Sequence, residues 1–167
     1  GKVVTNGAVP VFNLNVDVPG ADVTAFAGYI PEGTSGTADF NGIVWGSTED
    51  VRVKGTAGLH HVTYNGYTVD EASADVNYSG QTVAVDSLTA RAFGAYIKGT
   101  AYYDVNTGGY TAEADVSGLD LTAVPDMPVG VMGIVSGSFR AGGNSKDGSI
   151  LAAGTVQAAN LSYNGLA

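Results

Sequence analysis

The sequence FNLNVDVPGADVTA, residues 12–25, alternates apolar and polar side chains over its first seven positions. The apolar side chains occupy positions 12, 14, 16 and 18, and two asparagines and an aspartate lie between them. Successive side chains of a β-strand point to opposite faces, so this stretch predicts a strand with one apolar and one polar face. The same alternation returns in residues 51–54, 73–79, 82–92 and 110–116.

The composition agrees with a mostly β protein. The 167 residues include 25 glycines, 44% of the residues are hydrophobic and only 14% are charged. The straight-chain residues that favour helices are scarce. A net charge of −9 with seven Lys and Arg makes nucleic acid an improbable partner, because few cations are present to neutralise phosphates. The chain has no cysteine, and no run of about 18 apolar residues suggests a membrane span.

Turn signals separate the alternating runs and predict hairpins, because Asn-Gly and Asp-Gly favour the positive φ angles of tight turns. Strands of about 6–10 residues would then form a long antiparallel meander of about 12–14 strands. One short helical turn is expected at residues 24–28 and another at 122–124. The predicted turns are Asn6-Gly7, Asn41-Gly42, Asn65-Gly66, Ser79-Gly80, Asp147-Gly148 and Asn164-Gly165.

The opening stretch has a second copy. FNLNVDVPGADVTA aligns with YTAEADVSGLDLTA, residues 110–123, and the pair shares Asp-Val, Gly, Asp and Thr-Ala. KGTAGLHHVTYNG, residues 54–66, aligns with AGTVQAANLSYNG, residues 153–165. The two offsets, 98 and 99 residues, indicate a repeated module in an elongated architecture. We therefore predict one continuous domain, residues 1–167, with a first repeat at about 11–108 and a truncated second repeat at about 109–167.

The second copy resembles the repeat region of the TamB family, the translocation and assembly module subunit, and its AsmA-like relatives. The resemblance rests on the order of a GLDLTAVPDMPVG corner, a GT-containing strand and the NLSYNG ending, residues 118–165. It implies an all-β fold, an elongated antiparallel β-meander bent into a U-shaped β-taco with an apolar groove. These motifs are degenerate, and the first copy carries them in the same order with more drift.

The resemblance also implies a function. The chain would be a periplasmic segment of a parent protein anchored in the inner membrane, with a groove that conducts phospholipid between the inner and outer membranes. Phospholipid acyl chains would be its partners, together with an outer-membrane assembly protein. No cofactor and no enzymatic activity would be expected.

The residues themselves leave three ways to cover an apolar sheet face: a sandwich, a closed barrel, or a trough that another molecule fills. Glycines at positions 36, 55, 99 and 154 would let strands bend sharply. In the trough model, about 60 Å of conduit is expected from the strand spacing. The predicted acyl-chain lining is Phe12, Leu14, Val16, Val18, Phe40, Val51, Val53, Val83, Val85, Tyr110, Val116, Phe139, Ile150 and Val156.

Few residues suggest chemistry. His60 and His61 are adjacent and would point to opposite faces of a strand, which makes a shared metal ion improbable. The acidic pairs at 49–50 and 70–71 are interpreted as solvated loop charges, and GGNSKDG at 142–148 as a hairpin loop without P-loop features. No catalytic or metal site is predicted.

Three alternatives stay open. Trp45, Tyr102 and Tyr103 could stack on a sugar, although a core or trough lining is preferred. The same trough could chaperone β-strands of outer-membrane proteins and autotransporters during assembly, since open sheet edges pair with added strands. From another class, the chain could be a parallel β-helix adhesin or polysaccharide-binding protein, but the long repeat and frequent hairpin signals disfavour that fold.

Overall fold

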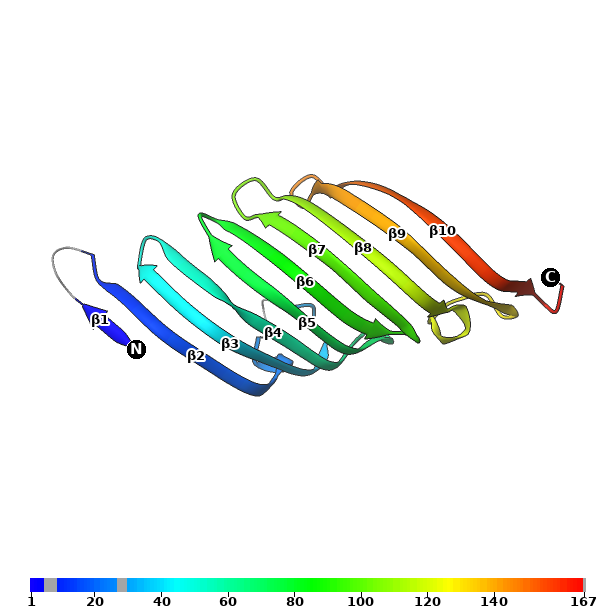
Figure 1. The fold of residues 1–167 in the computed structure, drawn as a ribbon, viewed down its shortest axis with the longest axis horizontal. Coiled ribbons are helices and arrows are strands. Elements are labelled where there is room, and N and C mark those ends of the chain that lie inside the picture. Colours follow the sequence, from blue (N-terminus) through cyan, green and yellow to red (C-terminus); the bar gives the residue numbers. More distant parts are fainter. Residues whose placement is uncertain (5–8, 27–29, 167) are drawn as a thin grey trace.

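The computed structural model describes residues 1–4, 9–26 and 30–166 and shows a single antiparallel sheet of ten strands in chain order (Figure 1). Every strand pairs with its neighbours in sequence, so the sheet is a simple meander. The strands are β1 (Lys2–Val4), β2 (Val11–Asp22), β3 (Ser35–Ser47), β4 (Val51–Tyr64), β5 (Tyr67–Ser79), β6 (Thr82–Ala92), β7 (Ala95–Asp104), β8 (Gly109–Asp120), β9 (Val131–Asn144) and β10 (Ser149–Tyr163).

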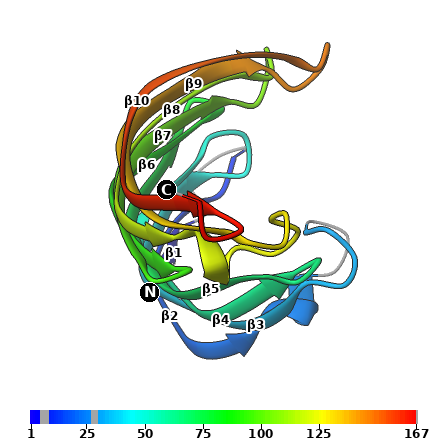
Figure 2. The same cartoon turned by 90° about the vertical axis from the view of Figure 1, so that its right-hand side faces the viewer.

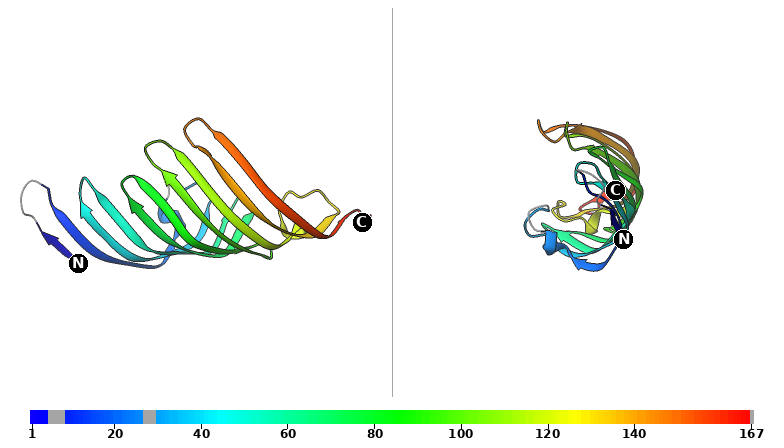
Figure 3. Two further views of the ribbon diagram at one scale, coloured as in Figure 1. Left: turned by 45° about the horizontal axis from the view of Figure 1, so that its top comes forward. Right: turned by 90° about the vertical axis from the view of Figure 1, so that its left-hand side faces the viewer.

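The sheet is curved and open. Seen along its long axis, the strands bend in the same direction and the sheet does not close on itself (Figures 2 and 3). In the described residues the only helices are two single 3₁₀ turns, η1 (Val23–Phe26) and η2 (Leu121–Ala123), close to the two predicted positions. All inter-strand pairings are antiparallel, so the alternative of a parallel β-helix is wrong for this part of the chain.

Strand number and length differ from the sequence-based expectation. Strands β2 to β10 are 10–15 residues long and the described sheet has ten of them, against 12–14 shorter strands expected. At about 4.8 Å between neighbours, ten strands span about 45 Å instead of 60 Å. The reason is that alternation continues through residues that resemble turn signals, such as Asn41-Gly42 in β3.

Four of the six predicted turns are confirmed. Turns follow Tyr64, Ser79 and Tyr163 and precede Ser149, each at or next to its predicted dipeptide. Asn41-Gly42 was wrong: the Asn41 side chain donates a hydrogen bond to Asp17 on β2, 3.3 Å away, and Gly42 pairs with Gly55 on β4. The sixth, Asn6-Gly7, lies outside the described residues.

The even-numbered strands β2 to β10 each carry one β-bulge. At each bulge one residue has a positive φ angle, which locally twists and bends the strand. The bulge in β6 explains why the apolar alternation changes phase between Val85 and Leu88. The positive-φ residues are Gly20, His61, Ser87, Gly118 and Asn160.

Glycines within the strands permit the close approach of neighbouring backbones. A Cβ atom added at Gly55 or Gly99 would lie 2.4 Å from a carbonyl oxygen of the next strand, and one at Gly154 would lie 2.7 Å from such an oxygen. At Gly36 the φ angle is +132° and a Cβ would lie 2.8 Å from the His61 carbonyl oxygen. Real Cβ atoms do not make such contacts, so all four predicted bend positions require glycine in this conformation.

The sequence repeat corresponds to a structural repeat, because the order β2-η1-β3-β4 returns as β8-η2-β9-β10. At the first corner the Asp22 carboxylate accepts hydrogen bonds from the Thr24 backbone N–H and hydroxyl, at 2.8 and 2.7 Å. Asp120 and Thr122 repeat both contacts at 2.9 and 2.6 Å. The shared Asp-x-Thr motif is therefore a corner cap.

Candidate functional site

One face of the sheet is apolar from β2 to β10. Residues paired across antiparallel strands lie on the same face, so the register can be followed from strand to strand. Three rows cross all nine strands. The first row is Leu14, Val44, Val53, Tyr78, Val83, Tyr103, Tyr110, Gly143 and Ile150. The second is Val16, Gly42, Gly55, Val76, Val85, Ala101, Ala112, Ala141 and Ala152. The third is Ala21, Ala38, Leu59, Ala72, Ala90, Ile97, Val116, Gly137 and Val156.

These rows, with the shorter rows beside them, define what we call the apolar face. No charged side chain interrupts the three rows, and tyrosine hydroxyls are their only side-chain polar groups. All fourteen predicted lining residues lie on this face, nine of them in the three rows and the other five in the shorter rows. The five are Phe12, Val18, Phe40, Val51 and Phe139, which the register places through the pairs Phe12↔Gly46, Gly46↔Val51, Val18↔Phe40 and Phe139↔Gly154.

The opposite face is polar. Its cross-strand neighbours form hydrogen bonds and ion pairs, including Thr56 with Asp75 at 3.1 Å and Arg140 with Glu113 at 2.8 Å. Trp45 lies on this face, since it pairs with Asn13 and Arg52, and so does Tyr102. Tyr103 lies on the apolar face, so the structure does not bring the three aromatic residues together as a sugar-stacking site.

Much of the apolar face stays open to solvent in the described residues. Only four side chains in this part of the chain are buried, and three of them are alanines: Val23, Ala74, Ala92 and Ala95. Large apolar side chains stay open to solvent, and Phe139 is 40% exposed and Val156 57%. A protein of this size normally buries a closed core, so the uncovered face is the feature that a function must explain.

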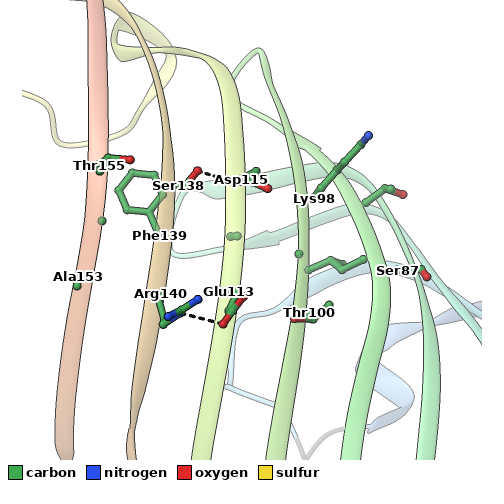
Figure 4. A pocket seen from close by; sticks show the side chains of 15 residues that line it. Ser87, Lys98, Thr100, Glu113, Asp115, Ser138, Phe139, Arg140, Ala153 and Thr155 are labelled. Atoms are coloured by element: carbon green, nitrogen blue, oxygen red, sulfur yellow. Dashed lines mark hydrogen bonds and ion pairs between the residues drawn. The ribbon is translucent and has the colours of Figure 1, made fainter.

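A cavity of about 1020 Å³ lies over strands β6 to β10 (Figure 4). It is centred on a shorter apolar row in which Gly99 and Ala114 leave space beside the Phe139 ring. Polar residues next to this row also line the cavity. Figure 4 shows the Arg140–Glu113 ion pair and the Ser138–Asp115 hydrogen bond among them. The complete row is Leu88, Gly99, Ala114, Phe139 and Gly154.

The candidate chemical groups are dispersed. His60 Nε2 lies 2.5 Å from the Asp39 carboxylate on the polar side of the sheet, whereas His61 occupies the β4 bulge. Asp50 pairs with Arg52 at 2.8 Å. The pair at 70–71 lies within β5 and not beside a turn, which corrects the loop interpretation. Of the GGNSKDG stretch, residues 145–148 form the β9–β10 hairpin loop, as expected, whereas residues 142–144 belong to strand β9.

Asp39 is a structural residue that the sequence pattern did not reveal. Its carboxylate accepts a hydrogen bond from the Gly20 backbone N–H, 2.6 Å away, at the β2 bulge. This contact, followed by the one to His60, holds the pKa of Asp39 below its usual range. In the second repeat the Ser136 hydroxyl accepts from the Gly118 N–H at 3.0 Å. Because the two capping residues differ, only the glycine could be recognised from the repeat.

The fold and this face define a class of protein: a single-layer antiparallel sheet with one uncovered apolar face. Among the described residues, no helix has the length and apolar character needed to cross a membrane, and no three His, Cys, Asp or Glu side chains gather as a metal site would require. No protein-family model, curated protein or solved structure matches the chain.

Proposed function

We propose that this chain is a segment of a periplasmic, membrane-bridging protein of the TamB and AsmA-like kind, whose apolar groove conducts phospholipid between membranes. The observation that carries the proposal is the apolar face, which continues through nine strands with no charged side chain in its three complete rows. The rows run across the strands, along the long axis of the curved sheet (Figure 3).

We infer that the apolar face lines the inside of the curve, which gives the U-shaped cross-section of a β-taco. Two observations support this. Along β8, residues on the apolar face are half-buried and those on the polar face are exposed, as expected where side chains converge inside a bend. A Cβ at Gly42, Gly99 or Gly137 would also collide with the backbone of the next strand, at 2.4, 2.4 and 2.3 Å.

Such a groove would lower the barrier to lipid movement. Each CH₂ group removed from water is worth about 0.8 kcal/mol, so two bare acyl chains would cost on the order of 20 kcal/mol to carry through water. A groove with similar residues in every strand keeps the shielded area nearly constant as a chain slides. No single tight site is needed for such movement.

Site-specific photocrosslinking in bacterial cells tests the proposal. A photoreactive amino acid at Val53 or Val85 on the apolar face is expected to yield phospholipid adducts detectable by mass spectrometry. The matched control places the same group at Lys54 or Ala84, the adjacent positions on the polar face, where adducts should be rare. Equal labelling of both faces, or adducts with protein alone, would argue against lipid conduction.

A second candidate function concerns the long antiparallel strands of the sheet, such as the 15-residue β10. The sheet could guide β-strands of outer-membrane proteins, because an open edge can pair with an added strand. Val85→Glu places a charge on the apolar face and is expected to stop lipid transfer without blocking strand pairing. Val156→Pro in β10 is expected to stop strand guidance instead, so the defect caused by each variant separates the two functions.

A further inference from the structure

The apolar face differs between the two ends of its strands. Because the sheet is a meander, every second connection lies at the same end. The first row crosses the sheet near one end, and the third row crosses it near the other end, where the two corner caps lie. We call these the tip end and the corner end. The tip end carries the short loops 48–50, 80–81, 105–108 and 145–148.

Tyrosines line the apolar face near the tip end. The first row contains Tyr78, Tyr103 and Tyr110, and Tyr103 pairs directly with Tyr110. The second and third rows contain only glycine and aliphatic residues. A tyrosine joins an apolar ring to a polar hydroxyl and is favoured where an apolar region meets a wet one. The first row therefore forms a boundary between the apolar face and the loops of the tip end.

The hydroxyls of this row are directed toward the tip end. The Tyr103 hydroxyl oxygen lies 3.2 Å from Ser145 Oγ, and the Tyr110 hydroxyl donates a hydrogen bond to the Ser149 carbonyl oxygen, 3.4 Å away. Ser145 begins the β9–β10 loop, Ser149 follows it, and Lys146 lies within it. Hydroxyl and ammonium groups thus gather at this end, and such hydrogen-bond donors suit a phosphate group.

The corner end offers a phosphate no cation. The connections at this end and the residues that border them are 22–34, 64–67, 92–95 and 120–131, and none of these ranges contains a lysine or an arginine. Their charged residues are Asp22, Glu32, Asp120 and Asp126. Like charges repel, so an anionic headgroup is disfavoured at the corner end and favoured at the tip end.

The corner end is also closed over β6 and β7. Ala92 and Ala95 pair with each other and continue the apolar face beyond the third row, and they are only 4% and 2% exposed. Phe93 packs edge-on against Tyr67, with ring centroids 6.1 Å apart, and the Tyr67 hydroxyl donates a hydrogen bond to Asp126 at 3.4 Å. These contacts join β5, the β6–β7 turn and the segment after η2, and leave no room for a headgroup beside the two alanines.

From these differences between the two ends, we propose that a phospholipid lies on the apolar face in one orientation, with its phosphate headgroup at the tip end and its acyl chains directed toward the corner end. The inference rests on the proposed function, because it assumes a lipid on this face. Ile97 in the third row and Tyr103 in the first are about 20 Å apart along an extended strand. The hydrocarbon region of one leaflet is roughly 15 Å thick, so an acyl chain fits between the two rows.

Fluorescence quenching tests the orientation. In a Trp45→Phe background, which removes the single tryptophan, Tyr103→Trp and Ile97→Trp place reporters on the apolar face at the two ends of β7. Phosphatidylcholine with a nitroxide on its headgroup is expected to quench the reporter at position 103 more strongly than the one at position 97. A nitroxide near the end of an acyl chain should reverse this order. Tyr102→Trp on the polar face is the matched control, and neither probe should quench it.

Two results of this experiment contradict different claims. Equal quenching of both reporters by each probe would overturn the orientation, although the lipid still binds. No quenching of either reporter would overturn the proposed function together with the orientation.

The role of the tyrosine hydroxyls is tested with two lipids that differ only in the headgroup. Tyr103→Phe combined with Tyr110→Phe is expected to weaken the binding of dihexanoylphosphatidylcholine about tenfold, because hydrogen bonds to a charged phosphate are lost. The binding of dihexanoylglycerol, which has no phosphate, should not change. Tyr102→Phe removes a hydroxyl from the polar face and should alter neither affinity. Calorimetric titration measures all of these; a loss for both lipids, or none for the phosphatidylcholine, would overturn the placement of the phosphate at the first row.

Discussion

At the scale of single residues, the curvature of this sheet depends on backbone conformations that few side chains permit. The bulges use glycine at positions 20 and 118, but His61, Ser87 and Asn160 adopt positive φ angles without being glycine. Such a conformation costs an ordinary residue roughly 1–2 kcal/mol. Their presence indicates that strand pairing on both sides of a bulge outweighs the local strain.

The glycines at which neighbouring backbones approach closely give the first prediction. Gly137→Ala is expected to destabilise the fold by about 1–3 kcal/mol, because the new Cβ must displace the Thr155 carbonyl oxygen. Gly58→Ala is the control in β4, where the nearest atom is a side-chain oxygen of Asp39 at 3.3 Å. That variant should stay within about 0.5 kcal/mol of the wild type. Urea denaturation measures both, and equal losses would contradict the explanation.

Asp39 gives the second prediction. The Gly20 N–H and then His60 lower the pKa of Asp39, so its contribution to stability is complete above the ordinary Asp value of about 3.9 and is lost as pH falls through the lower folded-state pKa. Asp39→Asn should therefore destabilise the protein at pH 7. The difference from the wild type should shrink in strongly acidic solution. Denaturation midpoints between pH 2 and 7 measure this, and a difference that stays constant with pH would exclude the mechanism.

At the scale of elements, the corner cap explains why a short motif was kept in both repeats while the surrounding residues changed. Asp22 and Asp120 each accept two hydrogen bonds from the threonine two residues later, and these bonds lower the pKa of both carboxyls. Each cap fixes the turn in which the chain leaves one strand before the next begins. The structure thus gives the Asp-x-Thr identity a physical cause.

The third prediction concerns these caps. Asp120→Ala is expected to lower the unfolding temperature, because the two hydrogen bonds of the corner cap are lost, and Asp22→Ala should lower it by a similar amount. The two sites lie on strands β2 and β8 and share no partner, so the double variant should lose about the sum of the two single effects. Thr122→Ser keeps the hydroxyl and serves as the control. Strong non-additivity in thermal unfolding would indicate that the two corners are coupled.

The sequence predicts some of these elements better than others. The alternation of apolar and polar residues predicts that Val16, Val53 and Val85 lie on one face. A strand with one apolar face shows a two-residue period in its sequence. The bulges were not predicted, since a single extra residue such as Ser87 changes the phase of the pattern without marking its own conformation. The turn predicted at Asn41-Gly42 does not form. The turn preference of this dipeptide is a local effect, whereas pairing of β3 with both of its neighbouring strands keeps these residues extended.

At the scale of the whole molecule, the sheet has one layer and no closed core in its described residues. Cross-strand pairs and the partial shielding of the apolar face must supply most of its stability. The candidate site is therefore the entire apolar face and not a local cluster, which explains why no short sequence motif marks it. The sequence pattern could predict its residues, but only the register shows that they form uninterrupted rows.

The fourth prediction follows from this exposure. A ligand that covers the apolar face binds only the folded sheet, so a short-chain phosphatidylcholine should raise the unfolding temperature. The gain should correspond to about 2.7 kcal/mol at a lipid concentration one hundred times its Kd. Val53→Glu should reduce this gain, whereas Lys54→Glu on the polar face should preserve it. A similar lipid effect on both variants would show that binding does not use the apolar face.

Because the strands pair in sequence order, the length of the sheet and the curvature of its strands are set by different features. Each strand pairs only with the strands before and after it in the described residues, so duplication of a hairpin would add about 10 Å to the long axis and leave the other strand pairs as they are. The bulges and bend glycines, in contrast, set the width of the curve within each strand. Copies of a hairpin can therefore lengthen the sheet while the curvature of each strand stays the same.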